Sequence, residues 1–401
     1  MMELETIARA SQFMLVIASR VSAISAAWPK AARLSDSRRN GDFSTTCSTH
    51  RLAWSGQIVP WNFSLMFTSG KMGLALAAGN AVVLKPSEIT PLSTLRIVEL
   101  MAEVGFPAGV VNVAPGYGNA ASQRPGEHPG VGKKIVFTGS AATGRRIVEA
   151  SQGNLKRVQL ELGGKGANAV FHDADLDSAI KGAPRAILHN HGHACIAGSR
   201  LILYERIADQ FLDRFVGLAA SIHDDNSLDP DTEIGPPTSL QHLEHATAYV
   251  DVAREQRGRV LTGGTAQDAS LADGYYVRPT AVEAKTAQDR IAQEDVFGPL
   301  VTVLRFGTDD EALQIANGTD YGRGRGLWTR DLSRAHCTAA HIHAGMWWID
   351  CYKRVNPGGP FSGVGQSGSG PEMGHEAMHD YTEARSVWVN VDGNGPPHFK
   401  H

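Results

Sequence analysis

The sequence predicts an α/β protein of two domains, the first of them built on a doubly wound parallel sheet. The chain has 401 residues, which is more than a single hydrophobic core usually accommodates. From Gly56 onward, short apolar runs that end in proline or glycine alternate with segments of helical spacing, as in a parallel sheet. Apolar residues make up 42% of the chain and charged residues 20%, as is typical of globular proteins.

We expect the chain to divide into four parts. Residues 1–54 form a divergent segment that is assigned no function. A helix is expected over residues 4–28, and the polar stretch SDSRRNGDFSTTCSTH that follows lacks either secondary-structure period. Residues 55–163 form the first α/β domain, and residues 164–381 form a second one. Residues 382–401 carry the alternating run ARSVWVNV, which predicts an exposed strand, and a frayed tail.

The predicted elements of the first domain follow one another in order. Helices are expected over residues 69–78 and 91–104, where apolar residues recur at helical spacing. In the second domain, a long helical pattern starts near residue 174 and another covers 208–222. The strand candidates of the first domain are GQIVPWNF, NAVVLKP, GVVNVAPG, KKIVFTGS and RVQLELGG.

Charge and cysteine usage narrow the function classes. The formal net charge is -3 with both signs interspersed, which argues against nucleic-acid and membrane partners. The four cysteines have neither metal-ligand spacing nor the density of a disulfide-stapled fold, so we expect no metal site and a cytoplasmic location.

Two residues stand out as candidates for chemistry. Cys195 lies among small residues in GHACIAGS, a setting that suits an accessible thiol, although a single cysteine is more often a buried small apolar residue. Glu161 ends a strand-like run before two glycines, where a carboxylate could act as a general base or simply be solvated.

Two further strings suggest a nucleotide site. FTGSAATG is a strand followed by a glycine-containing turn and a helix, which would present backbone N–H groups to a pyrophosphate. KPSE follows a buried-type strand, and its glutamate could bind a ribose hydroxyl. A surface turn is the alternative for KPSE, and FTGSAATG departs from the usual dinucleotide spacing.

Together these strings resemble the aldehyde dehydrogenase superfamily. The resemblance covers Gly56 to about Val391 and also rests on QIVPWNF, LELGGK, QEDVFGP and SGSGPEMG. It implies a Rossmann-like cofactor domain, a second α/β catalytic domain, and oxidation of an aldehyde to a carboxylic acid. It also implies a homodimer or homotetramer with no partner beyond its small-molecule aldehyde.

The resemblance assigns roles to five catalytic residues. Cys195 is the nucleophile that forms a thiohemiacetal and then a thioester, and Asn62 holds the oxyanion. Glu161 activates the deacylating water, with Lys71 and Glu372 as a relay.

The resemblance also assigns the cofactor and substrate contacts. NAD is the expected cofactor and NADP is less favoured, because Glu88 would reject a 2'-phosphate. Phe361 matches an aromatic residue of the substrate tunnel. The matched cofactor residues are Trp61, Lys85, Glu88, Gly139, Ser140, Gly144, Asp295 and Phe297.

Several positions depart from the family pattern. Asp295 stands where a glutamate is usual, and Arg323 and Arg325 replace small or apolar residues on a segment expected to be partly buried. An unpaired cation there would be costly. The region before Gly56 is short, so we expect an N-terminally truncated or divergent relative whose strand ARSVWVNV lacks much of its hairpin partner.

Two alternatives remain open at this stage. One is a catalytically impaired relative that acts as a binding or structural protein, and it is motivated by the N-terminal departure and the two arginines. The other is a dehydrogenase that passes its acyl group to coenzyme A, although this reaction would not need Glu161. The sequence does not identify which aldehyde is oxidised.

Overall fold

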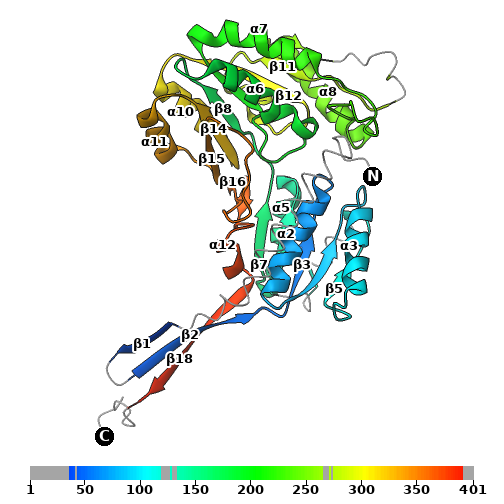
Figure 1. Ribbon diagram of the computed structural model, residues 1–401, viewed down its shortest axis with the longest axis vertical. Coiled ribbons are helices and arrows are strands. Elements are labelled where there is room, and N and C mark those ends of the chain that lie inside the picture. The colour runs from blue at the N-terminus through cyan, green and yellow to red at the C-terminus, as the bar shows by residue number, and fades with distance from the viewer. Residues whose placement is uncertain are drawn as a thin grey trace.

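Two large sheets and a small projecting one organise the molecule (Figure 1). The computed structural model describes residues 36–40, 43–118, 127–128, 133–264, 271 and 274–391. Among these residues, no helix is both long and apolar enough to cross a membrane. The helix expected over residues 4–28 lies outside the described residues.

The first large sheet has the strand order β17-β7-β6-β3-β4-β5. Its five parallel strands, all expected from the sequence, are β3 (Trp54–Ile58), β4 (Ala81–Lys85), β5 (Val111–Val113), β6 (Lys134–Thr138) and β7 (Arg157–Glu161). The strand β17 (Gly368–Ser369) pairs antiparallel with β7 at one edge. Because the chain runs from β3 first to one side and then to the other, the sheet is doubly wound, as predicted.

Helices cover both faces of this first sheet. Met66, Phe67 and Leu74 of α2 (Ser64–Ala77) pack against Val82 and its neighbours on β4. On the other face, α5 (Ala141–Ala150) joins a core with residues of β3, β6 and β7. The helix α3 (Leu92–Glu103) follows β4.

The second large sheet has the strand order β10-β11-β12-β9-β8-β14-β15 and is parallel except for β10. Its strands are β8 (Ala167–Val170), β9 (Arg200–Tyr204), β10 (Arg259–Thr262), β11 (Thr280–Glu283), β12 (Leu300–Phe306), β14 (Gly324–Trp328) and β15 (Met346–Ile349).

Helices also lie on both faces of the second sheet. The helices α6 (Leu176–Leu188) and α7 (Glu205–Ser221) share one core with its strands, and α10 (Asp309–Asn317) shares another. The remaining elements are α8 (Leu240–Glu255), α9 (Arg290–Gln293), α11 (Leu332–His341), α12 (Glu376–His379), the 3-10 turns η3 (Ser151–Asn154) and η4 (His189–Gly192), and the short strands β13 (Tyr321–Gly322) and β16 (Val364–Gly365).

Side-chain caps fix where several helices begin. Asp175 precedes α6 and accepts a hydrogen bond from the Ser178 N–H, and Thr308 precedes α10 and accepts one from the Glu311 N–H. Each cap satisfies a backbone donor that has no partner within its helix.

The third sheet corrects the expectation for the N-terminal segment. The strands β1 (Asp36–Asn40) and β2 (Phe43–Arg51) form a hairpin, and β2 pairs along nine residues with β18 (Thr382–Asn390). The predicted strand therefore has a partner along one edge, while its other edge is unpaired within the described part of the chain. The β2 sequence shows no apolar alternation, and residues 44–51 and 382–390 are exposed or half-buried on both faces of the strands, so backbone pairing defines the strand.

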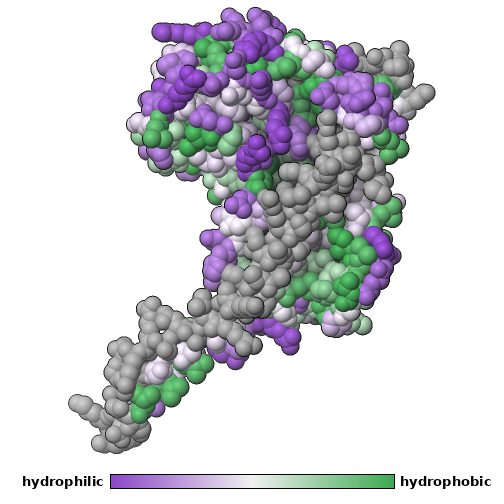
Figure 2. All heavy atoms as spheres, viewed as in Figure 1, coloured by the Kyte–Doolittle hydropathy of each residue, from purple (hydrophilic) through white to green (hydrophobic). Residues whose placement is uncertain are grey.

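This sheet projects as an arm from the two larger ones (Figure 1). Apolar atoms are visible on the arm (Figure 2), and β18 exposes Val387, Trp388 and Val389. We propose that residues 36–51 and 382–390, which the sequence analysis placed in two separate parts, belong to one unit, because both contribute strands to the arm.

Two helical glycines show how tightly α6 and α7 pack against their neighbours in the second domain. A Cβ on Gly182 of α6 would lie 2.5 Å from the Trp328 ring, whereas one on Gly217 of α7 would have no neighbour within 4 Å. We expect Gly182→Ala to destabilise the protein by about 1 to 3 kcal/mol through overpacking. The matched control Gly217→Ala should stabilise it by about 0.5 to 1 kcal/mol. Thermal melting of both variants measures this, and a stabilising effect at Gly182 would contradict the packing described.

Candidate active site

The carboxyl ends of the first sheet bring together residues that are far apart in the sequence. Asn62 follows β3, Lys85 ends β4, Gly139 follows β6 and Glu161 ends β7. Because these strands are parallel, their carboxyl ends meet at one edge of the sheet. The order of the strands reverses around β3, and the crevice outside such a reversal is where α/β sheets bind ligands.

Cys195 lies on a loop shaped by three left-handed residues. Asn190, His191 and Gly192 all have positive φ angles, of 55°, 56° and 73°. A Cβ on Gly192 would lie 2.0 Å from the Gly298 carbonyl oxygen, so only glycine fits there. The turn brings the loop back toward the first sheet and leaves the Cys195 side chain at the wall of a cavity.

Asn62 connects the end of β3 to this loop. Its side-chain amide donates a hydrogen bond of 3.0 Å to the His193 carbonyl oxygen, which also accepts one of 3.1 Å from the Asn190 amide. Asn62 thus contacts the loop two residues before Cys195, and its role in binding the oxyanion stays a prediction.

The cavity beside Cys195 is largely apolar. Phe361, the expected tunnel residue, lines it and is only 2% exposed. Arg185, His189 and Lys353 add polar groups to the wall. The other lining residues are Phe63, Met66, Phe67, Ala194, Ile196 and Val355.

Glu161 is fully buried, and it forms an ion pair with Arg323. The sequence indicated that an unpaired cation at Arg323 or Arg325 would be costly, and Arg323 is paired. Arg325 donates to the Asn317 side chain and, at 2.6 Å, to the Tyr321 carbonyl oxygen. Both arginines are buried. Arg323 has the Glu161 carboxylate as its counter-charge, whereas Arg325 has hydrogen-bond acceptors but no ion pair among the described residues.

Lys71 and Glu372 lie together as the resemblance implied. Their side chains form a buried ion pair, and Lys71 also donates a hydrogen bond of 2.7 Å to the Thr138 hydroxyl at the end of β6. Lys71 is therefore fixed at the same sheet edge as Glu161.

Burial shifts the pKa values of these groups. Desolvation raises the pKa of Glu161 to about 7, against the opposing effects of Arg323 and Lys71. Desolvation also lowers the pKa of Lys71 to about 7. The pKa of the Cys195 thiol is raised by burial, and the Arg323 cation opposes that shift. Groups titrating near neutral pH are suited to proton transfer.

Several of the expected cofactor residues lie at or near the carboxyl ends of the first sheet. Lys85 and Glu88 form an ion pair at 2.9 Å after β4, and Ser140 caps α5 by accepting from the Thr143 N–H. A Cβ on Gly144 would lie 2.8 Å from the Leu162 side chain, and one on Gly139 would lie 2.4 Å from the Phe137 ring. Both glycines thus permit close packing of the turn and of α5 on the sheet.

Trp61 and Phe297 lie edge to face with ring centroids 5.7 Å apart, and the His193 ring contacts both. Asp295 is half-buried, and its carboxylate accepts hydrogen bonds of 3.2 Å from the Gly164 and Phe297 N–H groups. Its carboxylate is therefore turned toward the protein backbone.

Sequence reasoning missed two parts of this site. It did not find the Arg323 partner, because Glu161 lies 162 positions away in the chain and no local pattern connects them. It also overlooked His193, whose ring packs against Trp61 and Phe297. The signal for Arg323 was a lone cation in an apolar strand pattern.

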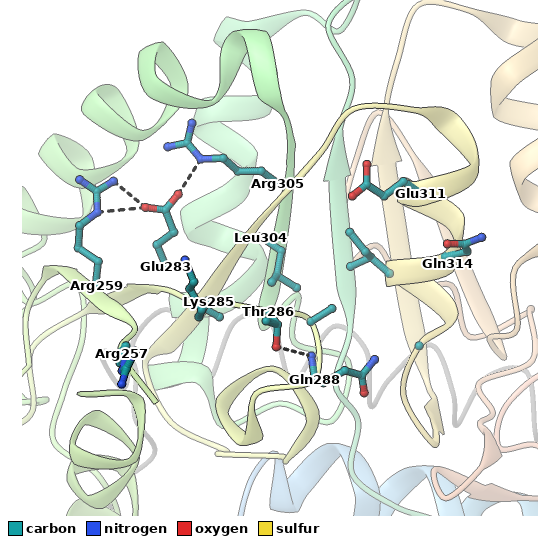
Figure 3. A pocket seen from close by; sticks show the side chains of 14 residues that line it. Arg257, Arg259, Glu283, Lys285, Thr286, Gln288, Leu304, Arg305, Glu311 and Gln314 are labelled. Atoms are coloured by element: carbon teal, nitrogen blue, oxygen red, sulfur yellow. Dashed lines mark hydrogen bonds and ion pairs between the residues drawn. The ribbon is translucent and has the colours of Figure 1, made fainter. Parts of the chain in front are cut away.

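A second pocket lies away from this site, where β10, β11 and β12 meet α10 (Figure 3). Glu283 at its wall accepts hydrogen bonds from Arg259 and Arg305, so opposite charges at the wall offset each other. None of the residues predicted from the sequence lines this pocket.

Comparison with known proteins identifies the family of this chain. The model of the aldehyde dehydrogenase family matches residues 6–387, and so extends further toward the N-terminus than the motifs did. A Burkholderia cenocepacia protein assigned as an aldehyde dehydrogenase is 64% identical, with a TM-score of 0.90 over 99% of this chain and 88% of that chain.

Two further relatives agree with that match. PnpE, known from Pseudomonas sp. WBC-3, is 56% identical in its complex with nicotinamide adenine dinucleotide, with a TM-score of 0.90 over 99% of this chain and 88% of that one. An aldehyde dehydrogenase of Emericella nidulans is 42% identical over 333 residues, which are 83% of this chain and 66% of the relative. The chain thus spans about two thirds of the length of that curated relative, and it belongs to the aldehyde dehydrogenase family.

Proposed function

We propose that this protein oxidises an aldehyde to a carboxylic acid through a thioester on Cys195. The observation that carries the proposal is the position of Cys195, which lines an apolar cavity and lies on a loop bound to the cofactor-type sheet through Asn62. A reactive thiol at the junction of a substrate cavity and a nucleotide crevice is the arrangement that this chemistry requires.

NAD is the cofactor that we propose for the crevice. Support comes from the complex of PnpE with nicotinamide adenine dinucleotide and from the residues present here. The N-terminus of α5 follows β6 at the sheet edge and offers N–H groups to a pyrophosphate. Lys85 and Glu88 are suited to the adenosine ribose, and Trp61 and Phe297 to the nicotinamide end. When bound, NAD supplies the acceptor for the hydride that leaves the aldehyde carbon.

Each catalytic step is assigned to particular residues of the chain. The Cys195 thiolate attacks the carbonyl carbon, and the Asn62 amide with the Cys195 N–H stabilises the oxyanion. Glu161 takes a proton from the water that attacks the thioester, and Lys71 with Glu372 carries that proton onward. The raised pKa of Cys195 means that a base must remove its proton before attack, so acylation should become faster as pH rises.

Removal of the thiol tests the proposal directly. We expect the purified protein to form NADH from NAD with at least one member of a panel of aliphatic, aromatic and acidic aldehydes. Cys195→Ser should abolish this activity, because a serine hydroxyl is a far weaker nucleophile at neutral pH. Cys337→Ser, at an exposed cysteine, is the control and should leave NADH formation unchanged. Equal turnover by Cys195→Ser would contradict the proposal.

Asn62 and Asn190 provide a matched pair for the oxyanion role. Both amides bind the same carbonyl oxygen, but only Asn62 is proposed to bind the reacting oxygen. Asn62→Ala should lower kcat about 10² to 10³-fold, as for loss of one oxyanion donor. Asn190→Gly, which keeps the left-handed backbone accessible, should lower it far less. A similar loss in both variants would indicate that Asn62 only orders the loop.

A further inference from the structure

Arg323 crosses from the second sheet to the first. It lies directly before β14, and its side chain passes Gly164, where an added Cβ would lie 3.0 Å from the Arg323 Cβ. From there the guanidinium reaches the end of β7, where Nη1 donates to the Glu161 carboxylate. The Arg323 side chain therefore connects the second large sheet to Glu161, the residue proposed as general base in the first sheet.

The guanidinium is held by several contacts that do not involve Glu161. Nε and Nη2 donate to the Leu162 carbonyl oxygen at 3.3 Å and 2.9 Å, and Nη2 donates to the Ser367 carbonyl oxygen at 3.1 Å. The guanidinium carbon also lies 5.3 Å from the centre of the Phe361 ring. These acceptors belong to different parts of the fold, so they fix the planar group in position and orientation.

Glu161 is held beside the cavity and does not form part of its wall. Its side chain has no exposed surface, and the lining of the Cys195 cavity includes Phe361 but not Glu161. Oε2 contacts Arg323, while Oε1 accepts no hydrogen bond from the described part of the chain. The carboxylate is thus attached at one oxygen to a fixed cation, outside the wall of the cavity that Cys195 lines.

Hydrolysis of the thioester requires Glu161 to act on a water molecule. The water oxygen bonds to the acyl carbon as Glu161 accepts the water proton, and the carbon–sulfur bond then breaks to release the carboxylic acid and the Cys195 thiolate. Pairing with arginine makes the carboxylate a weaker base and fixes its position, so Glu161 must loosen that contact to reach a water molecule beside Cys195.

We propose that Arg323 is a positioning residue that holds Glu161 in a resting ion pair, and that this makes thioester hydrolysis slower than thioester formation. The inference rests on the function proposed for Cys195 and Glu161, and it adds a residue that sets the rate of the hydrolysis step. Acyl-enzyme accumulates in the wild-type protein, and weakening the ion pair shortens its lifetime.

The test uses 4-nitrophenyl acetate, which acylates a thiol without NAD or knowledge of the natural aldehyde. Cys195 attacks the ester carbon, nitrophenol leaves, and hydrolysis of the acetyl thioester completes the cycle. We expect wild-type protein to release nitrophenol in a burst equal to its active sites, followed by a slow linear phase. In Arg323→Leu the linear phase should be about tenfold faster at alkaline pH, a part of what a general base can supply.

The pH profile of the linear phase separates positioning from simple structural damage. Hydrolysis should rise with pH as Glu161 loses its proton, whose pKa is about 7 in the wild type. Arg323→Leu removes a cation that lowers this pKa, so the rise should move to higher pH. Arg323→Lys keeps the charge but loses the guanidinium contacts, so its linear phase should accelerate while the rise stays near its wild-type position.

Arg325→Leu is the matched control, because Arg325 is also buried at β14 but contacts Asn317 and Tyr321. It should change neither the linear phase nor the pH profile. Arg323→Leu in a Glu161→Gln background should give no acceleration. Equal linear phases in wild type, Arg323→Leu and Arg323→Lys would overturn the inference, as would the same acceleration in Arg325→Leu. If mass spectrometry finds no acetyl group on Cys195, the proposed function fails and this inference fails with it.

Discussion

The close approach of three glycines to the active-site loops is the constraint on which the rest of this structure depends. Gly163, Gly164 and Gly166 lie on the segment that leads from β7 to β8, between the two large sheets. A Cβ would lie 2.2 Å from an Asp295 carboxylate oxygen at Gly163, 2.6 Å from the Cys195 carbonyl oxygen at Gly164, and 2.3 Å from the Ala197 carbonyl oxygen at Gly166. Because these positions carry no side chain, the link between the sheets can pass directly against the nucleophile loop.

That contact explains why buried charges collect at the junction of the sheets. Glu161 and Lys71 come from the first sheet and its helix, Arg323 comes from the second sheet, and Glu372 comes from the segment that leads to the arm. Each charge is removed from water, and pairing offsets part of that desolvation. Desolvation, opposed in part by these charge interactions, leaves Glu161 and Lys71 with pKa values near 7, where small changes in contact alter their protonation.

The sequence allowed the five parallel strands to be predicted because their apolar runs and terminal glycines or prolines are local signals. Cys195, Glu161 and Asn62 were found by family resemblance, and the fold brings them to one edge of the first sheet. The β2 strand was missed because it is polar on both faces and is defined by pairing with β18, more than 300 residues away. The partner of Arg323 was missed for a similar reason, because Glu161 is distant in the sequence. A buried arginine is costly without a partner, and only the fold shows that Glu161 lies beside it.

The central claim is that Cys195 carries the acyl group between oxidation and hydrolysis, and intact-protein mass spectrometry tests it most directly. Glu161→Gln protein would be mixed with NAD and each aldehyde of a panel, and the reaction stopped with acid. The account predicts that an active aldehyde adds its own mass less two hydrogens, and that peptide mapping places this adduct on Cys195. NADH formation with no adduct on Cys195, or with the adduct on another residue, would contradict it.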